Sequence, residues 1–287
     1  MPALWMILAS LLFACMGVSV KFGANLFPTA ELTFYRGLAG VLIMAALMRA
    51  RRTPWRTPHL RLQLSRAVAG SIALGCYFFA ISILPLATAV TLNYTSPLFV
   101  ALMLALWFGE RLRPLAIFAV ALGFVGVVVL LRPTLAADQW HGALAGLGTG
   151  LVASLAYIHV RELGRAGEPE TRTVFYFSLV TTLGAAPFVL FGEGFHWPDA
   201  RGALVLAGVG LFGSGAQLAM TRAYRYGATI VAANLAYSTV VFASLFGVLL
   251  WGEHLDGAAL AGIGLIVASG IAVSLARHAP AAAKRTD

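Results

Sequence analysis

The sequence carries little charge, since only 11% of its 287 residues are Asp, Glu, Lys or Arg. A typical soluble domain has about 25%. Hydrophobic residues make up 60% of the chain, more than a water-exposed globule of this size can bury. Cysteine is also scarce, and Cys15 and Cys76 both lie in apolar runs, which excludes a disulfide framework. The composition therefore predicts an all-α integral membrane protein.

Ten apolar runs are long enough to cross a bilayer, which takes about 20 residues per helix. All 11 acidic residues and all six histidines lie between these runs, at their ends or in the C-terminal tail. Proton relays in membrane proteins use carboxylates or histidines inside the spans, and none is available here. No Walker sequence for ATP hydrolysis is present either. The predicted spans are residues 3–21, 30–48, 66–83, 88–108, 114–131, 142–160, 173–191, 203–221, 229–251 and 257–276.

The basic residues gather in alternate connections between the spans. Of the 20 Lys and Arg residues, 16 fall in one set of loops and termini, three in the other set, and Arg36 falls within a span. Short loops rich in Lys and Arg stay in the cytoplasm, so the loop 49–66 and both termini are predicted to be cytoplasmic. Topology thus explains the net charge of +9, and no nucleic-acid partner is expected.

Two halves of the chain repeat one another at a constant shift of 143 residues. Five spans separate equivalent points, and five is odd, so the second half is predicted to cross the membrane in the opposite sense. The predicted repeats are residues 1–135 and 140–277, followed by a tail, 278–287. Inverted repeats are typical of secondary transporters. Tyr94, Gly109, Glu110, Leu112 and Ala116 fall on Tyr237, Gly252, Glu253, Leu255 and Ala259.

Three segments resemble the EamA family of the drug/metabolite transporter superfamily: ELTFYRGL, YTSPLFVALMLALWFGERL and AYSTVVFASLFGVLLWGEHL. The resemblance covers residues 3–276. Within the family, the sequence most resembles the YddG-type exporters of aromatic amino acids. It implies ten spans in the inner membrane of a bacterium, a small-molecule substrate and no cofactor. Members move amino acids, drugs, nucleotide sugars and other metabolites, so the substrate stays open, as does the choice between monomer and homodimer.

The fourth and ninth spans offer matching polar groups at mid-membrane depth. Pro97 cannot donate a backbone hydrogen bond, so it predicts a kink that frees a carbonyl near Asn93. We expect Asn93, Tyr94 and Ser96 in the fourth span, and Asn234 and Tyr237 in the ninth, to line a substrate cavity. The alternative is hydrogen bonding that only holds helices together. Val240 replaces the proline in the second copy, which predicts that the two halves bend differently.

Further candidates come from other spans. Tyr77 and Tyr157 could present an aromatic face and a polar tip to a substrate, and Gln217 an amide. The alternative is that these side chains serve packing alone. Arg36 lies about two turns into the second span. It could bind the carboxylate of an amino acid, or it could pair with Glu31 or with carbonyl groups of neighbouring helices.

Together these features predict export of neutral amino acids, aromatic or otherwise large, by alternating access and facilitated diffusion. The cavity is expected to contain no basic cluster, which disfavours phosphate-bearing cargo. One alternative is a proton-coupled exporter of drugs or metabolites. The other is a polytopic membrane enzyme built on Glu253, His254 and Asp256, with His196 and Asp199 as neighbours.

The charge bias generates a topology prediction. A periplasm-dependent reporter fused after Arg277 should be inactive, because 16 of the 20 basic residues place the C-terminus in the cytoplasm. The same reporter inserted within the connection 192–200 should be active and serves as the control. Activity of the Arg277 fusion would overturn the predicted orientation.

Overall fold

The computed structural model describes residues 2–107, 114–134, 138–226 and 235–278, and every regular element in that part of the chain is an α-helix. Six helices are long and apolar enough to cross a membrane: α1 (Pro2–Gly23), α2 (Thr29–Ala50), α3 (Leu60–Ile83), α7 (Trp140–Arg165), α8 (Glu170–Leu190) and α9 (Ala200–Tyr226). The others are α4 (Leu86–Asn93), α5 (Ser96–Trp107), α6 (Pro114–Thr134), α11 (Ser238–Trp251) and α12 (Gly257–His278).

Prolines mark where several helices begin. Pro28, Pro85 and Pro169 immediately precede α2, α4 and α8. The first N–H groups of a helix have no partner inside it, so a residue without an N–H fits there at no cost. α3 begins at Leu60, six residues before the start that the sequence predicts at 66.

The fourth predicted span is two helices rather than one. The turn between α4 and α5 falls at Tyr94 and Thr95, next to Pro97, as the proline predicts. In the second half, a turn at Tyr237 immediately precedes α11. The two halves are therefore interrupted at equivalent positions although Val240 replaces the proline. The expectation that they bend differently stays a prediction, because residues 227–234 lie outside the described residues.

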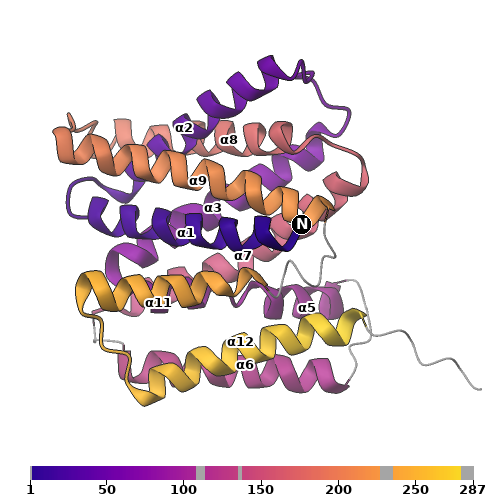
Figure 1. Ribbon diagram of the computed structural model, residues 1–287, viewed down its shortest axis with the longest axis vertical. Coiled ribbons are helices and arrows are strands. Elements are labelled where there is room, and N and C mark those ends of the chain that lie inside the picture. The colour runs from indigo at the N-terminus through magenta and orange to yellow at the C-terminus, as the bar shows by residue number, and fades with distance from the viewer. Residues whose placement is uncertain (1, 108–113, 135–137, 227–234, 279–287) are drawn as a thin grey trace, which may run out of the picture.

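The most extensive helix contacts join one half of the chain to the other. α1 packs on α9, α2 on α8, α3 on α7 and α6 on α12, while α4 packs on both α7 and α11. Figure 1 shows the helices running side by side across the view, from α2 and α8 at the top to α6 and α12 at the bottom. First pairs with eighth and third with sixth among the predicted spans, which is the exchange expected of two five-helix repeats related by a two-fold axis. The inverted repeat itself stays a prediction.

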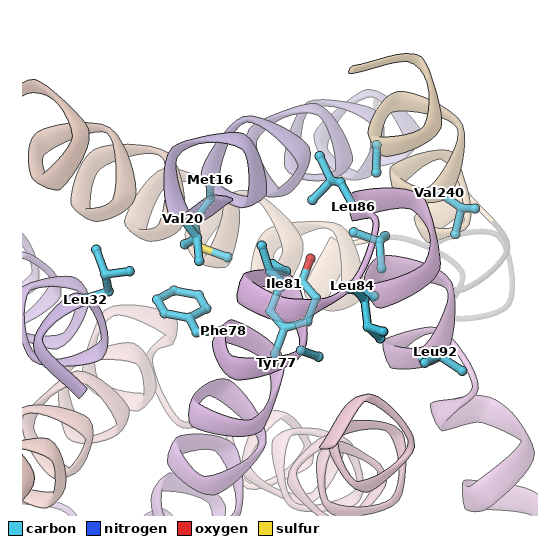
Figure 2. Packing of buried hydrophobic residues seen from close by; sticks show 14 of the residues in the cluster. Met16, Val20, Leu32, Tyr77, Phe78, Ile81, Leu84, Leu86, Leu92 and Val240 are labelled. Carbon is cyan, nitrogen blue, oxygen red and sulfur yellow. The ribbon is translucent and has the colours of Figure 1, made fainter. Parts of the chain in front are cut away.

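The main apolar core surrounds the corner where α3 turns into α4. Phe78 and Ile81 of α3 are fully buried with Met16 of α1 and Leu86 of α4, and Val240 of α11 closes the cluster. Figure 2 shows these side chains arriving from separate helices at this corner. The packing fixes the C-terminal half of α3, and with it the position of Tyr77, which belongs to the same cluster.

At one end of the bundle, Glu253 joins the two halves. Its carboxylate pairs with Lys21 of α1 and accepts a hydrogen bond from the backbone N–H of Leu86, 2.8 Å away, at the first residue of α4. A carboxylate is stabilised by the unpaired N–H groups and positive dipole end of a helix N-terminus. The eight residues of α4 are therefore anchored at their first turn by the opposite half.

At the other end, Glu168 holds the connection between α2 and α3. It accepts hydrogen bonds from Thr57 Oγ1 at 2.7 Å, Gln63 Nε2 at 3.0 Å and Arg172 Nε at 2.7 Å. Arg172 also donates to the carbonyl oxygens of Pro54 and Arg56 at 3.1 and 2.6 Å. Burial alone would raise the pKa of Glu168, but the hydrogen bonds from Thr57 and Arg172 outweigh it and hold the pKa below the ordinary 4.5.

We expect Glu168→Gln to lower stability by about 1–3 kcal/mol at pH 7, since hydrogen bonds to a charged group are lost. Because the folded pKa of Glu168 lies below the unfolded one, its ionisation stabilises the fold above pH 4.5 and loses this effect as pH falls through the folded value. The variant should lose that acid-side fall in melting temperature. Glu162→Gln, which breaks only the exposed pair with Arg165, is the matched control. Identical pH profiles for Glu168→Gln and the wild type would contradict this role.

Candidate functional site

A cavity of about 90 Å³ lies where the two halves of the bundle meet, and we refer to it as the central cavity. Its wall is formed by α1, α3, α7, α8 and α9, by the break after α4 and by α11. The side chains that line it are mainly aromatic, amide and small: Phe13, Arg66, Gly70, Ala73, Leu74, Tyr77, Asn93, Tyr94, Thr149, Ala153, Ala156, Tyr157, Phe177, Gln217, Met220 and Thr239.

The central cavity brings together residues predicted separately from different spans. Tyr77, Asn93, Tyr94, Tyr157 and Gln217 all line it. They come from both halves of the chain and from positions up to 140 residues apart. The wall therefore has aromatic faces able to stack on a substrate and amide groups able to hydrogen-bond to it.

Other predicted residues lie outside the wall. Ser96 is buried at the first residue of α5 and does not line the cavity. Tyr237 is only 3% exposed, and its hydroxyl lies against Gly270 of α12, where any larger side chain would collide with it. Asn234 lies outside the described residues.

Tyr237 supports the wall from behind. Its ring packs on Tyr94 with a centroid separation of 5.7 Å, and the Tyr94 hydroxyl lies 2.7 Å from Thr239 Oγ1. Each contact joins the break in the first half to the equivalent segment of the second half. Tyr237 is therefore placed to orient Tyr94 rather than to touch a substrate in this state.

Arg66 is a cavity-lining residue that the sequence-based topology misses. Expected in a cytoplasmic loop, it lies in the second turn of α3, is only 4% exposed, and lines the central cavity. Its guanidinium carbon is 4.2 Å from the centre of the Phe177 ring. Nε and Nη1 of Arg66 have no hydrogen-bond partner among the described residues. The expectation of a cavity without a basic cluster did not anticipate this single basic group.

A sequence signal for Arg66 does exist. Arg66, Gly70, Ala73 and Tyr77 follow one another at intervals of four, three and four residues, which puts them on one face of a helix. All four line the central cavity. In a helix that begins at Leu60, Arg66 lies in the second turn, on the same face as Tyr77.

Arg36 is buried behind the wall and is only 1% exposed. Its Nη2 donates to the carbonyl oxygen of Gly213 on α9 at 3.1 Å, which confirms the predicted bond to a neighbouring helix. The predicted pair with Glu31 is not formed. Glu31 instead accepts hydrogen bonds from Nδ1 and the backbone N–H of His196, at 2.8 and 3.0 Å.

Two acidic residues of the alternative catalytic cluster have structural partners. Glu253 binds Lys21 and the start of α4, and Asp256 accepts a hydrogen bond from the N–H of Ala259 in the first turn of α12 at 2.7 Å. Within the described ranges, no three His, Cys, Asp or Glu side chains gather as a metal site would require. The acidic residues near the ends of α11 and α12 are thus accounted for by helix capping and pairing.

A multi-pass helical membrane protein whose halves enclose a polar and aromatic cavity is a carrier of small molecules by its architecture. The model of the EamA-like transporter family matches residues 1–132 and, a second time, residues 140–275. The chain belongs to this family.

Relatives agree over nearly the whole chain. The pseudopaline exporter of Pseudomonas aeruginosa is 34% identical over 269 residues, which cover 93% of this chain and 94% of that protein. A riboflavin transporter of Rhizobium johnstonii is 29% identical over 238 residues, covering 82% and 76%. One protein crystal structure has the same fold, with a TM-score of 0.71 and 24% identity over 98% of this chain and 99% of its own. The relatives are named exporters or transporters, and this chain is a transporter rather than an enzyme.

The wall residues should differ in their access to water. In a variant with Cys15 and Cys76 replaced by alanine, we expect Asn93→Cys and Tyr157→Cys to react with a water-soluble thiol reagent, because both positions line the central cavity. Tyr237→Cys should react about tenfold more slowly, since thiol reactivity requires exposure. Mass spectrometry of the labelled protein measures all three rates. Equal rates at Tyr157 and Tyr237 would contradict the assignment of the wall.

Proposed function

We propose that the protein exports amino acids with aromatic or other large neutral side chains, or metabolites that resemble them, across the bacterial inner membrane by alternating access. The observation that carries this proposal is the central cavity, whose wall combines Tyr77, Tyr94 and Tyr157 with the amides of Asn93 and Gln217. Aromatic rings suit a large apolar side chain, while amide and hydroxyl groups suit a charged amino-acid headgroup.

The arrangement of the halves supports alternating access. The pairs α1 with α9, α3 with α7 and α4 with α11 each join the two proposed repeats, residues 1–135 and 140–277. The double match of the family model supports the same division. In carriers of this kind the substrate lies near the midplane between the repeats, and rocking of one half against the other changes which side it faces.

Arg66 adds a basic group that favours a carboxylate over an uncharged substrate. It is the one basic side chain among the described residues that line the central cavity. A phosphate carries about two negative charges, and burying both beside a single arginine remains unfavourable. The wall thus favours a cargo with one carboxylate. The relatives named for pseudopaline and riboflavin indicate that the scaffold itself accepts different solutes, so selectivity comes from the wall.

The main alternative is proton-coupled export. Among the described residues, no carboxylate lines the central cavity. Glu31 is fully buried near the start of α2, where it is bound to His196. Intramembrane proton relays run through carboxylates or histidines along the substrate path, and this wall supplies neither. Facilitated diffusion therefore fits the wall better.

Transport by purified protein in sealed vesicles tests the proposal. We expect phenylalanine and tryptophan to leave the vesicles at least about tenfold faster than aspartate or glucose 6-phosphate, because a second or doubly charged anionic group would be buried unpaired. Collapsing the proton gradient with an uncoupler should change the phenylalanine rate little.

Protein-free vesicles measure the passive leak, and aspartate controls for the amino-acid headgroup without the aromatic ring. Equal rates for all four solutes would remove the substrate claim. Loss of phenylalanine flux with the uncoupler would instead establish the proton-coupled alternative.

A further inference from the structure

Two buried arginines approach the same aromatic ring. The guanidinium carbon of Arg66 lies 4.2 Å from the ring centre of Phe177, and that of Arg36 lies 5.8 Å from it. They come from α3 and α2, while Phe177 comes from α8. Phe177 is itself buried, and it lines the central cavity together with Arg66. Phe177 therefore contacts one arginine that lines the cavity and one that does not.

Among the residues that the structure describes, neither arginine has an acidic partner. The ion pairs formed within the described ranges use Lys21, Arg165, Arg172, His196 and Arg222. Arg36 and Arg66 each keep Nε and Nη1 without a hydrogen-bond partner there. A buried, unpaired charge is strongly unfavourable, and contact with one aromatic face offsets only part of that cost. An anion entering the central cavity would supply the missing charge.

The chain makes room for both guanidinium groups. A side chain at Gly70 would collide with Nη1 of Arg66, and one at Gly213 would collide with Nε of Arg36. The glycines lie on α3 and α9, directly against the groups they accommodate. The space around each guanidinium therefore exists because these positions carry no side chain.

The two arginines lie at different depths. Arg36 is seven residues into α2 and Arg66 six residues into α3, so each is about 10 Å from the start of its helix at 1.5 Å per residue. The two helices are consecutive and begin at opposite ends of the bundle. Glu31 and His196 meet near the first turn of α2, whereas Gln63 and Glu168 meet near the first turn of α3. Phe177 therefore contacts two basic groups whose helices begin at opposite ends of the bundle.

We propose that Arg66 and Arg36 are two successive binding positions for the carboxylate of the transported metabolite, with Phe177 as the barrier between them. In this state the carboxylate binds Arg66 in the central cavity. When the halves rock, the Phe177 ring moves aside and the carboxylate passes to Arg36. This inference rests on the proposed export function and names its substrate class, a small monocarboxylate with an apolar body.

Binding is tested first, with a pair of probes that does not depend on the identity of the natural cargo. Benzoate and benzamide share a ring and differ in the carboxylate. Arginine-specific modification by phenylglyoxal, followed by mass spectrometry, should label Arg66 in purified protein and leave Arg36 unmodified. We expect benzoate to slow the labelling of Arg66 at least about fivefold and benzamide to have no effect, because only the carboxylate pairs with a guanidinium. Equal protection by both probes overturns the proposal.

The barrier is tested by removing its ring. In Phe177→Ala, Arg36 should become labelled by phenylglyoxal, and benzoate should then protect Arg36 as well as Arg66. Labelling of Arg36 in the wild type at the same rate as Arg66 would contradict a barrier at Phe177. So would failure of benzoate to protect Arg36 once it is reached.

Transport and stability separate binding from support of the fold. Arg66→Gln should lower phenylalanine flux at least about tenfold while its melting temperature stays equal to or above that of the wild type, since an unpaired buried charge has been removed. Arg66→Lys should keep part of the flux, because it keeps the charge. Arg61→Gln removes an exposed arginine one turn and a residue earlier in α3 and should leave flux unchanged. A fall in melting temperature without loss of flux in Arg66→Gln would make Arg66 structural.

Arg36→Gln completes the set. It should slow flux at least about tenfold while benzoate still protects Arg66, because only the second position is lost. Loss of benzoate protection in Arg36→Gln would reduce the two positions to one. If the wild type transports none of the amino acids, the proposed function fails, whereas the labelling experiments with benzoate still decide whether Arg66 and Arg36 bind a carboxylate.

Discussion

Inside a bilayer a polar group must find its partner within the protein, and the architecture depends on this constraint. Helices meet it along their length, but the break at Tyr94 and Thr95 does not meet it by itself. That break is enclosed by α7 and α11, where Tyr94 contacts Thr239 and Tyr237. An interruption of this kind is tolerated only where it is buried in protein or lines a cavity. The same reasoning applies to Arg66, which is tolerated at its depth because it lines the central cavity.

Charge placement also divides the molecule into parts with different tasks. Near both ends of the bundle, carboxylates are fully partnered, as with Glu253 on Lys21 and Glu168 on Arg172. Between the ends, the two basic groups beside Phe177 have no such partner in the described part of the chain. Satisfied polar networks make an element rigid, whereas an unsatisfied charge favours any ligand that completes it. The ion pairs therefore anchor the ends of the bundle, and the proposed recognition of a substrate lies between them.

The three segments that resemble the EamA family are sufficient for the family. Apolar run length predicts the helical membrane architecture, and polar groups inside the runs predict five of the wall residues. Tyr77, Asn93 and Gln217 are examples of polar side chains that lie inside apolar runs and line the cavity. Arg66 stands at the boundary between the arginine-rich loop 49–66 and the predicted span 66–83, so the charge bias assigns it to the loop, whereas α3 begins at Leu60 and buries it. The partners of Arg36 and Tyr237 depend on packing between helices far apart in the chain, and no local pattern encodes them.

Three of the residues that line the central cavity have very small side chains: Ala73, Ala153 and Ala156. They come from α3 and α7, two helices that pack along one another, so the room left for a cargo is set by methyl groups on one shared surface. A single exchange of one of these alanines for a larger or more polar residue would reshape the compartment without disturbing Arg66 or the anchors at either end. Substitutions at these alanines therefore offer a short evolutionary route to new cargoes, since they change the shape of the central cavity and leave Arg66 in place.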